Sequence, residues 1–66
     1  MKICVNGEQY DAPDGLTVAE LLRRRGARER GSAVAVDGEV VPRGQWEGHV
    51  LADGQVVELV HAVQGG

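Results

Sequence analysis

The chain has 66 residues, the size of a single small domain with one hydrophobic core. A domain of this size buries only about 60% of the surface that its unfolded chain exposes, so an enclosed substrate pocket beside the core is not expected. The formal net charge of −3 disfavours nucleic acid as the main partner and suits an acidic protein that meets a basic surface.

Two short strands are predicted at the start of the chain. Residues Lys2–Val5 alternate between the two sides of a strand and stop at Asn6-Gly7, a pair that favours a two-residue hairpin turn. A second strand is expected from Glu8 to Ala12, where the turn-forming residues Pro13-Asp14-Gly15 follow. These segments predict an N-terminal β-hairpin.

An amphipathic helix is predicted after this hairpin. Thr17 and Glu20 form a capping-box pattern, in which the hydroxyl and the carboxylate accept hydrogen bonds from backbone amides at the helix start. Gly26 is a typical residue just past a helix end. The apolar residues that recur at i, i+3 and i+4 are Val18, Leu21 and Leu22.

A second hairpin is predicted next. The strand Ala33–Val36 is followed by Asp37-Gly38, another two-residue turn signal, and Glu39–Val41 pairs back until Pro42 ends the strand. Gln45 to Gly48 is expected to form one short helical turn.

The longest strand pattern comes last. It starts after the turn signal Asp53-Gly54, covers Val56 to Val63, and runs directly into Gln64-Gly65-Gly66. One helix can cover one face of one sheet, and the last strand most simply returns parallel to the first. We therefore expect an α+β protein with a β-grasp (ubiquitin-like) fold, in which a mixed sheet of about five strands and one main helix form a domain over residues 1–63.

The predicted core is aliphatic, because the chain has no Phe. The residues expected to face the helix are Ile3, Val5, Val18, Leu21, Leu22, Val34, Val36, Val57 and Leu59.

The final residues 64–66 are predicted to form a flexible tail. Glycine has no Cβ and adopts almost any backbone conformation, so Gly65 and Gly66 would make a thin thread that ends in a carboxylate. Extended, residues 64–66 would reach roughly 10 Å beyond the folded body. Such a thread fits a narrow active site that any side chain would block, although a frayed terminus would have the same composition.

Other reactive residue types favour structural interpretations. One cysteine cannot form an internal disulfide, and the lack of disulfides in so small a domain favours a reducing, cytoplasmic compartment. No apolar run is long enough to span a membrane. Cys4, His49 and His61 are too few for a structural zinc site, so no metal or cofactor is expected. Trp46 is expected to cover one edge of the core. Solvated side chains at the helix end are the favoured interpretation of the arginines Arg23, Arg24, Arg25, Arg28 and Arg30.

The ordered set of motifs resembles the ThiS-type family of ubiquitin-like sulfur carriers, which serve thiamine biosynthesis. The resemblance covers the whole chain, and its most specific part is Val40-Val41-Pro42-Arg43 with Trp46. Two positions differ from the family pattern, Gln55 after the Asp-Gly turn and Gln64 before the diglycine. The other matching segments are Val5-Asn6-Gly7, Gly15 to Leu22, Ala35-Val36-Asp37-Gly38, Asp53-Gly54 and Gly65-Gly66.

The resemblance implies a substrate protein that is not itself an enzyme. An ATP-dependent, E1-like adenylating enzyme would join the Gly66 carboxylate to AMP. Sulfur from a donor such as a cysteine desulfurase would then convert the terminus into a thiocarboxylate, and a thiazole synthase would receive the sulfur. The adenylating enzyme would recognise Gly65 and Gln64 as part of the extended tail.

A docking surface is predicted on the last strand. If Val57 and Leu59 face the core, then Glu58, Val60 and Ala62 lie on the sheet face away from the helix and form a candidate patch for partner enzymes. Three alternatives stay open: a sibling carrier for molybdopterin, cysteine or a specialised metabolite, a ubiquitin-like protein modifier, and an interaction module whose tail has no function.

Overall fold

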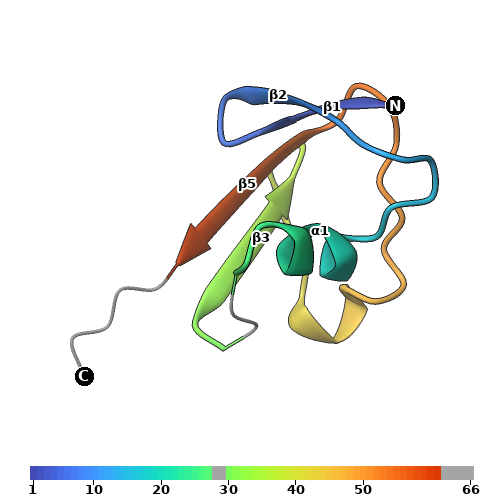
Figure 1. Cartoon of the computed structure of the whole chain (residues 1–66). Coiled ribbons are helices and arrows are strands. Elements are labelled where there is room, and N and C mark those ends of the chain that lie inside the picture. The colour runs from blue at the N-terminus through green and yellow to red at the C-terminus, as the bar shows by residue number, and fades with distance from the viewer. Residues whose placement is uncertain (28–29, 62–66) are drawn as a thin grey trace.

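The computed structural model describes residues 1–27 and 30–61. These residues form one sheet, and a helical layer covers one of its faces (Figure 1). None of the described helices is long and apolar enough to cross a membrane. The elements in chain order are β1 (Lys2–Val5), β2 (Glu8–Asp11), α1 (Val18–Arg24), β3 (Ser32–Val36), β4 (Glu39–Val40), the 3₁₀ helix η1 (Arg43–Gln45) and β5 (Val56–His61).

The sheet has five strands in the order β2-β1-β5-β3-β4. Strand β5 lies in the centre, parallel to β1 and antiparallel to β3. Strand β1 forms a hairpin with β2, and β3 forms a hairpin with β4. Helix α1 crosses one face of the sheet (Figure 1). The β-grasp prediction is therefore confirmed, including the parallel pairing of the first and last strands.

Both predicted hairpin turns are present, and the backbone shows why these residues occupy them. Asn6 and Gly7 have φ angles of 51° and 83°, and Asp37 and Gly38 have φ angles of 51° and 83°. Two consecutive residues with positive φ match the right-handed twist of the flanking strands, and Asn, Asp and Gly tolerate this conformation best.

The capping box at the start of α1 is also confirmed. The Glu20 amide donates to the Thr17 hydroxyl at 3.2 Å, and the Thr17 amide donates to a Glu20 carboxylate oxygen at 3.1 Å. The helix ends at Arg24, and Gly26 follows with a φ of 70°, as expected for a glycine that terminates a helix. The short length of α1 makes these caps important, because isolated helices of this size are not stable in water.

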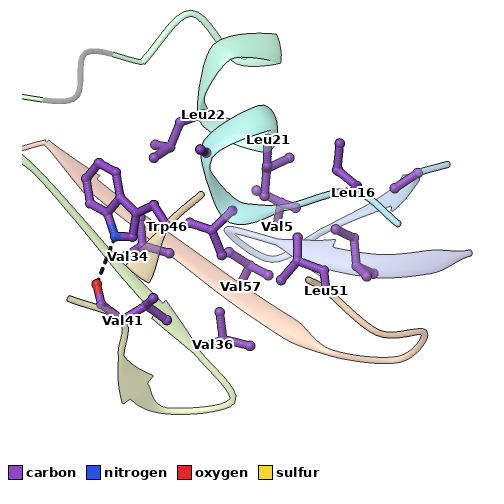
Figure 2. Packing of buried hydrophobic residues seen from close by; sticks show 14 residues of the cluster. Val5, Leu16, Leu21, Leu22, Val34, Val36, Val41, Trp46, Leu51 and Val57 are labelled. Atoms are coloured by element: carbon purple, nitrogen blue, oxygen red, sulfur yellow. Dashed lines mark hydrogen bonds between the residues drawn. The ribbon is translucent and has the colours of Figure 1, made fainter. Parts of the chain in front are cut away.

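The core lies between α1 and the sheet (Figure 2). Eight of the nine predicted core residues are buried, whereas Leu59 is only partly buried and packs at the margin. The core also contains buried residues that the pattern did not predict, most of them in loops: Ala12, Leu16, Ala19, Val41 and Leu51.

The segment between β4 and β5 closes one side of the core and begins its helical turn earlier than predicted. Instead of Gln45 to Gly48, the 3₁₀ helix covers Arg43–Gln45, and a hydrogen-bonded turn continues to Gly48. Pro42, with φ of −59°, precedes this turn and is already in a conformation that suits the start of a helix. Trp46, 3% exposed, covers the core edge as predicted, and its indole nitrogen donates to the Val41 carbonyl at 2.8 Å.

Most strand boundaries fall within one residue of the prediction. Strand β2 stops at Asp11, β3 starts at Ser32 and β4 stops at Val40. The predicted strand end at Val63 lies outside the described residues, and so does the proposed boundary between the domain and residues 64–66.

Side chains of the two hairpin turns hold β5 on both of its edges. The Asn6 amide group accepts from the Leu59 backbone amide at 2.8 Å and donates to the Leu59 carbonyl at 3.3 Å. On the other edge, the Asp37 carboxylate accepts from the Val56 amide at 2.9 Å. Because β1 ends at Val5, the Asn6 side chain takes the place of the next strand residue and extends the parallel pairing along β5.

We predict that Asn6→Gly lowers stability even though glycine suits the turn. The positive φ is retained, but both hydrogen bonds to Leu59 are lost, and each such bond contributes about 1 kcal/mol. Thermal unfolding should show a melting temperature lower by roughly 4–8 °C per kcal/mol lost. Exchange of the Leu59 amide hydrogen should accelerate at the same time.

Asn6→Asp is the matched control, because it keeps the acceptor for the Leu59 amide and removes the donor to the Leu59 carbonyl. Its stability should lie between those of the other two proteins. An unchanged melting temperature in Asn6→Gly would mean that Asn6 matters only for the turn.

Candidate functional site

The predicted site residues fall into two groups. Glu58 and Val60 belong to β5 and are described by the structure, and both are exposed. Ala62, Gln64, Gly65 and Gly66 lie outside the described residues. The structure therefore shows the surface from which the final residues continue, and the roles of those residues remain predictions.

Glu58 and Val60 point away from the helix, as predicted. Val57 is fully buried and Leu59 is partly buried against the core, so the alternate residues of β5 face the opposite side of the sheet. The partners in register with Glu58 and Val60 on β3 are Ala35 and Ala33. Since cross-strand partners share a face, this side of the sheet presents small and apolar side chains beside the carboxylate of Glu58.

We call this surface the open sheet face. It extends from β1 to β4, because Cys4 is in register with Val56 and Ala35 is in register with Val40. Three of its valines are substantially exposed, namely Val40 at 74%, Val60 at 59% and Val56 at 47%. The described residues that form it are Cys4, Ala33, Ala35, Val40, Val56, Glu58 and Val60.

Contiguous exposed apolar side chains on a folded domain mark an interaction surface more often than scattered single ones do. On the open sheet face, valines from two strands flank the alanines of a third, with no bulky side chain between them. Such a flat apolar surface with a single carboxylate suits a protein partner better than a small ligand.

The sequence prediction identified only the part of this face that belongs to β5. Val56 could have been added from the same alternation, and Ala33, Ala35 and Val40 from the pairing of strands in the second hairpin. The strand order that brings β3 beside β5 was the missing information.

Cys4 is half-buried on the open sheet face, because it alternates with Ile3 and Val5, which are buried against the helix. A shallow hollow of about 250 Å³ lies beside it, with Lys2, Gln9 and Asp53 among its lining residues. Within residues 1–27 and 30–61, no group of three His, Cys, Asp or Glu side chains could hold a metal ion.

Gln55, which departs from the family pattern, has a structural role at the start of β5. Its side-chain oxygen accepts from the Ala52 amide at 2.8 Å, and its side-chain nitrogen donates to the Asp37 carboxylate at 3.3 Å. Gln55 therefore stabilises the turn before β5 and the Asp37 side chain that holds this strand.

Comparison with known proteins gives consistent results for sequence and structure. The model of the family described as "ThiS family" matches residues 3–66. The sulfur carrier protein ThiS of Escherichia coli (strain K12) is 36% identical over 66 residues, and the alignment covers all of both chains. The crystal structure of the thiamine biosynthesis protein ThiS from Geobacter metallireducens superposes with a TM-score of 0.85 at 30% identity, again over the whole of both chains.

A second kind of relative is much larger. A thiazole synthase of Magnetococcus marinus is 38% identical to this chain over 66 residues, which are 20% of the length of that protein. A segment similar to the whole chain is therefore part of a protein named as a thiazole synthase. From the full-length match to the family, the full-length similarity to the Escherichia coli protein and the shared fold, we conclude that this chain belongs to the ThiS family of sulfur carrier proteins of thiamine biosynthesis.

Proposed function

We propose that this protein carries sulfur as a thiocarboxylate on Gly66 and donates it to the formation of the thiazole ring of thiamine. The observation that carries the proposal is the similarity to a sulfur carrier protein along the whole of both chains, which includes the final diglycine of this chain. The protein acts as a substrate of other enzymes and catalyses none of the steps itself.

The chemistry starts from a poor electrophile. An α-carboxylate is ionised at neutral pH, so the Gly66 carboxylate must first be activated. An E1-like adenylating enzyme joins it to AMP, and pyrophosphate leaves from ATP. The persulfide of a donor such as a cysteine desulfurase then attacks the carbonyl carbon and displaces AMP. Cleavage of the remaining S–S bond by a thiol leaves the thiocarboxylate.

The tail and the open sheet face have separate tasks in this proposal. Gln64 and Gly65 form the thread that enters the active site. Because Gly65 has no side chain, the thread is narrow enough for the Gly66 carboxylate to reach the reacting atoms. The open sheet face binds the enzyme and holds the folded body outside. Glu58 and Val60 are exposed on that face in the final strand, and Ala62 follows the same alternation.

A thiazole synthase is the proposed acceptor of the sulfur. The similarity of this chain to one fifth of a larger thiazole synthase supports the pairing, because domains joined in one protein commonly serve one reaction. A cytoplasmic location follows for this proposal, since a persulfide donor and a thiol reductant need a reducing compartment.

We predict that the protein gains one sulfur in place of one oxygen at its terminus. The purified chain is incubated with ATP, the adenylating enzyme and a persulfide donor, and the intact mass and the C-terminal peptide are then measured. The exchange should be found on Gly66, and a variant that lacks Gly65 and Gly66 should remain unmodified. An unchanged mass with an enzyme that charges its own carrier would contradict the proposal. Conjugates to lysine side chains without a thiocarboxylate would indicate a protein modifier instead.

We predict that Gly65→Val abolishes adenylation but leaves binding intact. Valine keeps the terminal carboxylate, but its branched Cβ widens the thread and restricts its backbone. The variant should therefore act as a competitive inhibitor of the wild-type carrier. Pyrophosphate release measures both effects.

A second substitution in this inhibitor tests the open sheet face. Adding Val60→Glu should weaken inhibition by about tenfold or more, which corresponds to about 1.4 kcal/mol of binding free energy. Val50→Glu is the matched control, because Val50 is 57% exposed, close to the 59% of Val60, but pairs with Thr17 at the start of α1, away from the open sheet face. Equal inhibition by both double variants would exclude the open sheet face as the docking surface.

A further inference from the structure

The charge of this chain is distributed very unevenly. Residues 23–30 contain five of the seven basic residues and one glutamate, which gives this segment a formal charge of +4. The other residues contain two basic and nine acidic side chains and therefore carry −7, in agreement with the total of −3. The protein thus has one basic segment on an otherwise acidic body.

This basic segment lies at the end of the sheet from which the tail continues. It starts in the last turn of α1 and leads directly into β3, whose first residue, Ser32, is in register with His61 at the end of β5. In Figure 1, the start of β3 lies beside the arrowhead of β5. Arg30, two residues before β3, therefore lies close to the end of β5, where the described part of the chain finishes.

Three arginines of this segment are available to a partner. Arg23 already forms an ion pair with Glu47, with 2.6 Å between a guanidinium nitrogen and a carboxylate oxygen. By contrast, Arg24, Arg25 and Arg30 are exposed, and in the described part of the chain none of them has an acidic partner. We call these three residues the basic end.

Capping of the helix accounts for Arg24 but not for the other two residues of the basic end. Cations in the last helical turn complement the helix dipole, and Arg23 and Arg24 meet that need. Arg25 follows the last helical residue, and Arg30 belongs to the approach to β3.

We propose that the basic end binds an acidic rim around the opening through which the adenylating enzyme admits the tail. The inference rests on the proposed function and adds the chemistry of the partner surface. Five residues follow His61, and they span at most about 17 Å. The reacting terminus can therefore reach well inside the enzyme while the basic end stays at its surface. There the basic end would face the acidic rim, and it would not contact the bound nucleotide.

The opposite charges of the basic end and of the acidic body orient the carrier before it contacts the enzyme. Charged patches of opposite sign raise association rates by about 10- to 1000-fold, and the effect declines as salt shortens the screening length. A carrier with a basic tail end and an acidic body approaches an acidic rim with its tail first. The basic end thus sets the rate of productive encounter, whereas the open sheet face sets how long the complex lasts.

The test is the salt dependence of adenylation by the purified adenylating enzyme, measured as pyrophosphate release. The variant is Arg25→Gln combined with Arg30→Gln, which leaves α1 unchanged because both residues lie after its last residue. We expect kcat/KM to fall about tenfold at roughly 0.05 M salt with kcat unchanged, and the difference to shrink to less than about threefold at roughly 0.5 M. Arg25→Lys combined with Arg30→Lys should retain most of the wild-type value.

Val50→Glu combined with Ala52→Glu is the matched control. It also makes the net charge more negative by two, but both residues are exposed away from the open sheet face and from the end of β5: Val50 pairs with Thr17 at the start of α1, and Ala52 lies in the turn before β5. An equal loss in this control would show that only the net charge matters and would overturn the proposal. A double glutamine variant with wild-type kcat/KM at low salt would also overturn it. If the wild-type chain releases no pyrophosphate at all, the proposed function itself fails, and the inference fails with it.

Discussion

The constraint on which the structure depends is the central place of β5 in the sheet. This strand comes last among the described elements, yet β1 and β3 do not pair with each other and are joined in the sheet only through it. Its pairing with both hairpins turns two separate ribbons into one surface that α1 can cover. The side chains of Asn6 and Asp37 secure the same strand from opposite edges. Stability of the domain and the position at which the chain leaves it are therefore determined by the same hydrogen bonds.

The two faces of this sheet separate the core from the surface that we propose for partner binding. The helix-facing side holds the aliphatic core, and Trp46 and the loop residues Leu16 and Leu51 complete it at the margins. These two loop residues are held at the core margin by a hydrogen bond, in which the Leu51 amide donates to the Leu16 carbonyl at 2.9 Å. The bond joins the loop before α1 to the loop that precedes β5. The other side is left with small apolar residues, so it can meet a partner without first giving up internal contacts.

Local chemistry made much of this fold predictable. Asn6-Gly7 and Asp37-Gly38 identify their turns because few other residues accept positive φ, and Thr17 with Glu20 identifies the helix start. Prediction failed where burial depends on distant partners: Leu16 and Leu51 lie outside periodic elements, and the open sheet face became complete only when β3 was placed beside β5. The roles that we propose for Gly65 and Gly66 rest on their place at the end of the sequence and on the family resemblance, because those roles would depend on another protein.

The long separation between β5 and its neighbours has a consequence for the order of folding. The hydrogen bonds between Asn6 and Leu59 join residues 53 positions apart, so the sheet cannot close until nearly all of the chain is available. A growing or truncated chain without β5 would keep two isolated hairpins, which are barely stable in water on their own. A partner that binds the open sheet face needs strands from both hairpins in their final arrangement. A partner of the kind we propose would therefore bind only carriers whose sheet is assembled.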